Sequence, residues 1–236
     1  MRVTSARSAG TPVPYLLHVQ LFDREAVAVL PSSDAALVFH DGGAHPKVVA
    51  LPPHGSVVVL DEVVAVWSLS PNIIKAMIGP PASVRGAVVR ASDHPALRLF
   101  AQVDGDRDAL PLLHDLRSAI TVTPDEREFE VLWRAYKLDQ KPLPQADRRV
   151  QRLMLRFAGQ TLSQIAAVDR LAATVQSDRE TGRSNSLGLF ADGSHYARSS
   201  RRLTGQSPSY WRNVSLPFYG GLPAQPYGGG EAPDGR

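Results

Sequence analysis

The chain has 236 residues, of which 43% are hydrophobic and 21% are charged, and it contains no cysteine. A chain of this size and composition can bury one or two cores, whereas the lack of cysteine excludes disulfide scaffolds and cysteine-ligated zinc fingers. No apolar run is long enough for a membrane span or a secretion signal. We therefore expect a cytoplasmic protein of two domains that does not associate with membranes.

Residues 1–105 have the pattern of a β-rich domain. Short β-branched runs at residues 34–43, 47–53 and 56–71 are separated by proline and glycine. This pattern is typical of antiparallel strands, and it predicts a small barrel or sandwich for the N-terminal half.

Four residues of the β-rich half could be considered as metal ligands: His40, Asp41, His45 and His54. Their spacing does not match that of a metal site, and histidines in loops near glycine and proline are more often solvated. No nucleophile elbow, phosphate-binding loop or zinc-protease motif occurs in the chain. We therefore predict no metal, no cofactor and no enzymatic activity.

Helical patterns follow at residues 72–79, 108–120 and 124–138. The third begins with a proline followed by acidic residues, which suit the first turn of a helix. Two prolines at 141–145 then predict a linker. Residues 106–145 are accordingly interpreted as a helical connector.

The helix predicted at 147–158 has the clearest periodicity in the chain. Its apolar face consists of Val150, Leu153, Met154 and Phe157. Another face carries Arg148, Gln151, Arg152 and Arg156. Such a face can contact DNA, with the glutamine amide able to pair with a base edge, or it can be a solvated face of an ordinary amphipathic helix. A second amphipathic helix is predicted over 162–175.

The C-terminal third is the basic part of the chain. Residues 145–215 contain 11 arginines and 5 acidic residues, a balance of +6, while the remainder carries 15 basic and 18 acidic residues, a balance of −3. Within this region, residues 194–202 form a basic helical pattern that Gly205 ends, and Ser207 with Pro208 begins another helix. The glycine- and proline-rich residues 216–236 are predicted to be a disordered tail.

The string FADGSHYARSSRRLTGQSPSYWR, residues 190–212, resembles the second helix-turn-helix of AraC-type transcription regulators, and residues 148–175 resemble their first recognition helix and linking helix. The resemblance implies an α+β protein: an N-terminal cupin-like barrel or sandwich, followed by an all-α double helix-turn-helix domain at residues 146–215. It implies double-stranded DNA as a partner, with a small-molecule effector and a homodimer as further partners of the N-terminal domain. The residues carried over to base reading are Arg148, Gln151, Arg152, Ser194, His195 and Arg198. Those carried over to phosphate contact or solvent are Arg149, Arg156, Arg201 and Arg202.

Some positions depart from the family pattern. Residues 181–190 are polar where the family has an apolar scanning helix, Ser200 replaces a large apolar anchor, and Gly193 replaces a glutamine. Two hypotheses follow: a regulator that reads adjacent major-groove segments with two recognition helices, or a degenerate relative that has lost DNA binding and acts through protein contacts.

Overall fold

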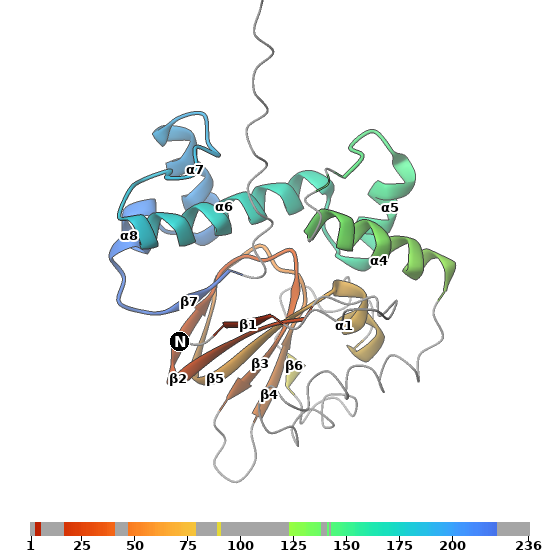
Figure 1. Ribbon diagram of the computed structural model, residues 1–236, viewed down its shortest axis with the longest axis horizontal. Coiled ribbons are helices and arrows are strands. Elements are labelled where there is room, and N and C mark those ends of the chain that lie inside the picture. Colours follow the sequence, from red (N-terminus) through yellow and green to blue (C-terminus); the bar gives the residue numbers. More distant parts are fainter. Residues whose placement is uncertain are drawn as a thin grey trace, which may run out of the picture.

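The computed structural model describes residues 3–5, 17–40, 47–78, 89–90, 123–137, 141 and 143–220. Within these residues an N-terminal sheet is followed by helices, so the α+β class is confirmed (Figure 1). The helix predicted at 108–120 and the predicted tail beyond residue 220 lie outside the described residues.

The described strands form one sheet with the order β1-β2-β5-β3-β4-β6, and β7 pairs with β2. Their bounds are β1 Val3–Ser5, β2 Leu17–Val29, β3 Ala35–His40, β4 Lys47–Leu51, β5 Val58–Leu69, β6 Val89–Arg90 and β7 Phe218–Tyr219. The predicted β runs correspond to β3, β4 and β5, whereas β1, β2, β6 and β7 were not predicted.

Strand β5 is central because it pairs antiparallel with both β2 and β3. Trp67 of β5 lies opposite Val19 on one side and Leu37 on the other. Trp67 is 1% exposed and packs against the ring of Phe39, with 4.3 Å between ring centroids. The β-branched runs therefore form strands for two reasons. Neighbouring strands supply hydrogen-bond partners for their backbone amides and carbonyls, and their apolar side chains are buried.

The helices are α1 Pro71–Ile78, α4 Pro124–Lys137, α5 Arg148–Phe157, α6 Leu162–Thr181, α7 Gly193–Thr204 and α8 Pro208–Asn213. Their ends follow local capping chemistry. Thr161 and Gln164 form a capping box at the start of α6, and Gly182 ends that helix in the left-handed conformation. None of the helices in the described part of the chain combines the length and apolar character that a bilayer crossing requires.

Helices α4, α5 and the start of α6 share one core. Phe129 and Trp133 of α4 pack with Met154 and Phe157 of α5, each at 0 to 1% exposure. Leu143 belongs to the same core at 6% exposure. The segment predicted as a linker therefore contributes a buried side chain to the core formed by the helices that it connects.

A second core joins the sheet to the other end of α6. It contains Leu30, which directly follows β2, with Val175 of α6, Tyr196 of α7 and Trp211 of α8. Strand β7 extends this contact, since the amide of Leu30 donates to the carbonyl of Tyr219 at 2.7 Å. The prediction of disorder from residue 216 is therefore wrong up to residue 220. Residues 217–219 form backbone hydrogen bonds with the end of β2, a long-range pairing that the sequence of the tail does not indicate.

A buried ion network connects the start of β3 to helices α4 and α6. The Lys137 ammonium lies 3.0 Å from the Asp169 carboxylate and 3.2 Å from that of Asp34. Asp169 also accepts the hydroxyls of Ser33 and Tyr136. Burial alone would lower the pKa of Lys137, but the two carboxylates outweigh it and raise that pKa. The ammonium is therefore held charged where β3, α4 and α6 meet.

Candidate nucleic-acid interface

Helix α5 places its apolar and cationic residues on separate faces. The Asp147 carboxylate caps its N-terminus by accepting the amides of Arg149 and Val150 at 2.7 and 3.3 Å. The four predicted core residues, Val150, Leu153, Met154 and Phe157, are all at most 3% exposed. The exposed face opposite them carries Arg148, Gln151, Arg152 and Leu155. Three of the residues predicted to read bases therefore lie together on one face.

One of the residues predicted to read bases, Gln151, already forms a hydrogen bond within the chain. The Gln151 side-chain amide donates to the carbonyl of Gln145 at 2.7 Å. The bond holds the carboxamide against the turn before α5, so contact with a base edge requires this bond to be exchanged.

Two arginines on the flank of α5 are held by carboxylates of α4. The Arg149 guanidinium lies 2.5 Å from Glu128 and 3.1 Å from Asp125, and Arg156 pairs with Asp125 as well. The hydrogen bonds that Arg149 donates to Glu128, together with the negative charge of Glu128, raise the pKa of Arg149. The prediction assigned Arg149 and Arg156 to phosphate or solvent and missed these pairs. Asp125 and Glu128, three residues apart on one helix face, were the available signal.

Helix α7 begins and ends as its sequence predicts. Asp192 accepts the amide of His195 at 2.7 Å, and Gly205 ends the helix with φ of 75°. The Asp192 pKa is lowered by that amide and by the neighbouring charge of Arg198. The exposed side of the helix carries Ser194, Arg198, Arg201 and Arg202.

His195 is less exposed than these four residues. It is half-buried and lies edge-to-face against the ring of Phe190, with 5.5 Å between centroids. The imidazole is therefore oriented by an aromatic neighbour at the rim of the α7 face.

The segment before α7 forms a turn. Residues 184–187 form turns, and the Asp178 carboxylate of α6 accepts the amides of Asn185 and Ser186 at 3.0 and 2.7 Å. Asn185 has a φ of 52°, a left-handed conformation that asparagine tolerates. Residues 184–187 are therefore in turns and not in a regular helix, and the Asp178 carboxylate orders their backbone.

The buried Ser200 of α7 is satisfied by hydrogen bonding. Ser200 is 0% exposed, and its hydroxyl donates to the carbonyl of Gln206 at 2.8 Å. Nearby, the Trp211 indole donates to the Thr204 hydroxyl at 2.9 Å. The sequence predicted a lost apolar anchor at Ser200. The structure instead has a polar anchor between α7 and α8.

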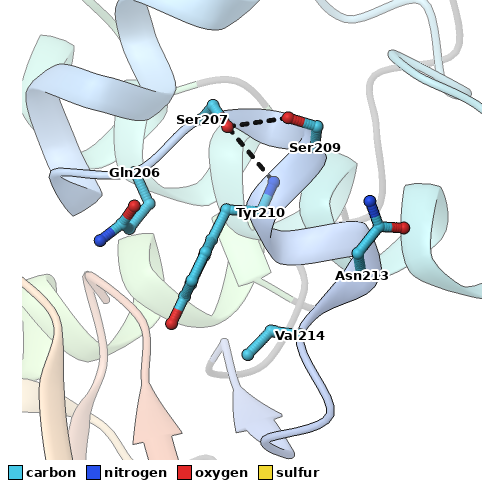
Figure 2. A pocket seen from close by; sticks show the side chains of 6 residues that line it. All are labelled: Gln206, Ser207, Ser209, Tyr210, Asn213 and Val214. Atoms are coloured by element: carbon cyan, nitrogen blue, oxygen red, sulfur yellow. Dashed lines mark hydrogen bonds between the residues drawn. The ribbon is translucent and has the colours of Figure 1, made fainter.

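A shallow groove of about 470 Å³ runs beside α8 (Figure 2). It is lined by Gln206, Ser207, Ser209, Tyr210, Asn213 and Val214. The Ser207 hydroxyl accepts the amide of Tyr210 and contacts Ser209, so its polar atoms serve to start α8. Its lining carries no charge and adds nothing to the cationic faces of α5 and α7.

His40 and His54, two of the residues considered as metal ligands, each contact a different backbone carbonyl. His40 Nδ1 lies 2.6 Å from the carbonyl of Asp61, and His54 Nδ1 lies 3.0 Å from that of Pro52. Burial lowers the pKa of His54. No group of three or more metal-binding side chains occurs in the described residues. Asp41 and His45 lie outside them.

Comparisons with protein-family models, with curated proteins and with solved structures found no match for this chain.

Proposed function

We propose that this protein is a DNA-binding transcription regulator of the AraC type. In this proposal α5 and α7 are the recognition helices of two helix-turn-helix modules, and α6 joins them. The reading residues are Arg148, Gln151 and Arg152 on α5, with Ser194, His195 and Arg198 on α7.

One observation carries the proposal: two amphipathic helices with arginines on their outer faces lie at opposite ends of one long helix. Figure 1 places α7 near one end of α6, on the side away from the sheet, and α5 near the other end, beside α4. Helix α6 has 20 residues, a length of about 30 Å. Successive major-groove segments on one side of DNA are roughly 34 Å apart. The spacing therefore suits simultaneous contact with two adjacent segments.

The charge distribution supports the same partner. The basic region 145–215 carries a balance of +6, whereas the rest of the chain carries −3. A basic surface attracts the phosphate backbone, and it makes binding depend on salt through release of counterions. Residues 1–105 carry 8 basic and 8 acidic residues and are neutral, so the excess positive charge lies in the helical region.

We assign control of DNA binding to the N-terminal domain. The proposal extends to a cupin-like barrel or sandwich that binds a small-molecule effector, forms a homodimer, or does both. The sheet contacts both ends of the helical region, through Lys137 at the α4 end and through β7 at the α8 end. A change in the sheet can therefore bias the position of either recognition helix.

The second candidate is a degenerate relative that acts through protein contacts. The observations that favour it are the α4 carboxylates, which occupy Arg149 and Arg156, and the turn that replaces a helix before α7. The arginines that remain exposed on α5 and α7 weigh against it.

Fluorescence anisotropy with a pool of random duplexes at several salt concentrations tests the proposal. The test variant is Arg148→Ala/Arg198→Ala, and the control is Arg127→Ala/Arg134→Ala, which removes two exposed arginines of α4 instead. If about six phosphates are contacted, log affinity falls with log salt at a slope near −5. We expect the test variant to bind weakly and with a shallower slope, while the control binds like wild type.

Folding of each variant is checked by circular dichroism. Absence of binding at about 50 mM salt by folded wild-type protein would reject DNA recognition by this chain and favour the second candidate. Equal loss in both variants would show that binding follows total charge and does not use the outer faces of α5 and α7.

A further inference from the structure

Leu155 is a large apolar side chain on the cationic face of α5. It is 50% exposed, although the helix has a complete apolar face on its other side. The large exposed apolar residues of the described chain are Val59, Val131, Leu155 and Tyr210. Leu155 follows Arg152 by three residues and Arg148 by seven, so the three share one side of the helix.

The exposed face of α5 has the spacing of a base-reading helix. Its four positions are Arg148, Gln151, Arg152 and Leu155, which lie at i, i+3, i+4 and i+7. Homeodomain recognition helices use four positions with this same spacing in the major groove. Leu155 is the apolar member of this set.

Packing against the described residues does not account for Leu155. The core beneath α5 is closed by Val150, Leu153, Met154 and Phe157 at no more than 3% exposure, and Leu155 points away from it. Half of the side chain stays in water, where an apolar group is unfavourable. Contact with an apolar group of a partner would remove that exposed surface.

The major groove offers such a group at one base. Thymine carries a 5-methyl group at its edge, and apolar side chains recognise thymine through it. The neighbouring Arg148 and Arg152 can meanwhile contact phosphate or guanine.

We infer that Leu155 is a specificity-determining residue that packs against the 5-methyl group of a thymine in the major-groove segment read by α5. This inference rests on the proposed function. It requires an A·T pair at one fixed position of the bound site, which the arginines alone do not specify.

The test replaces single thymines by deoxyuridine, which lacks only the 5-methyl group. The probe is a duplex selected by wild-type protein from a randomised pool. We expect one position at which deoxyuridine weakens wild-type binding by about fourfold, the value of one buried methyl group. Leu155→Ala should bind the two duplexes equally. Val131→Ala, which truncates an apolar residue of α4 that is 69% exposed, should keep the wild-type preference.

The outcomes separate this inference from the proposed function. Wild-type protein that selects no duplex overturns both. Wild-type protein that binds its selected duplex but tolerates deoxyuridine at every position overturns the inference and leaves the function standing. A deoxyuridine effect that persists unchanged in Leu155→Ala also overturns it, because another residue then contacts the methyl group.

Discussion

Helices α5 and α7 share a layout but are stabilised differently. Each begins at an aspartate N-cap and exposes arginines on its outer face. Beneath α5 lie four large apolar side chains, whereas α7 buries Tyr196 together with two small residues, Ser199 and Ser200, of which Ser200 donates a hydrogen bond to Gln206. Packing therefore fixes α5, while directional hydrogen bonds contribute more to α7. Hydrogen bonds of this kind are worth about 1 kcal/mol each, less than a buried leucine or phenylalanine.

The charges of the two helices also differ. Carboxylates of α4 form ion pairs with Arg149 and Arg156 of α5. On α7, Arg201 and Arg202 form no ion pair with any described carboxylate. The arginines of α5 are thus partly compensated by carboxylates of the chain, whereas Arg201 and Arg202 of α7 have no such compensation among the described residues.

The two ends of α6 are attached to the sheet by different means as well. The α4 end uses the buried ions Lys137, Asp34 and Asp169, and the α8 end uses apolar packing and β7. Buried charges tolerate the loss of one partner poorly, whereas apolar packing weakens gradually.

The largest expected effect is at the ionic end. Lys137→Met leaves the Asp34 and Asp169 carboxylates buried without their cation, so we expect a loss of about 3 to 5 kcal/mol in the free energy of unfolding. Urea denaturation measures this loss. Lys141→Met, at an exposed position, is the control and should change little. A similar small change in both variants would show that the network does not hold the α4 end.

The turn before α7 gives the next effect. Asp178→Ala removes the carboxylate that accepts the amides of Asn185 and Ser186, and we expect a loss of about 2 to 3 kcal/mol, the value for hydrogen bonds to a charged group. Urea denaturation gives the total, and hydrogen exchange should show faster exchange of those amides. Glu180→Ala, two residues along α6, provides the matched control. Unchanged exchange in the Asp178 variant would contradict the role of this carboxylate.

These two sites show where sequence prediction stops. The extent of α5, the end of α7 and the start of α8 could be predicted because periodicity and caps such as Gly205 and Ser207 are local signals. The ion pair of Lys137 with Asp34 joins residues 103 positions apart in sequence, and no local pattern marks it.

The strands show the same limit. Strand β2 was missed because Asp23 and Glu25 interrupt its apolar pattern where the register with β5 shifts. Strand β7 lies in a segment rich in proline and glycine, and pairing with β2 stabilises it. At the candidate interface, sequence identified the arginines of both helices but not the α4 carboxylates that bind two of them.

The difference in charge between α5 and α7 can be removed by the double variant Asp125→Asn/Glu128→Gln. It frees Arg149 and Arg156, so we expect tighter DNA binding and a salt slope steeper by about 2, corresponding to two more phosphate contacts. Anisotropy titrations measure both. Asp61→Asn/Glu62→Gln changes the charge equally at exposed positions of β5 and should leave the slope nearly unchanged. An equal gain in both variants would assign the effect to net charge.

The smallest expected effect concerns the cap of α7. The Asp192 pKa is lowered in the folded protein, chiefly by the amide of His195. A carboxyl group with a lowered folded pKa stabilises the fold above its unfolded pKa, roughly 3.9, and this stabilisation is lost as pH falls through the folded value. Asparagine caps without charge. The stability difference between wild type and Asp192→Asn, measured by denaturation from pH 7 to pH 3, should therefore shrink in acid. A difference that stays constant over this range would mean that the charge of Asp192 does not contribute and that the cap acts through hydrogen-bond geometry alone.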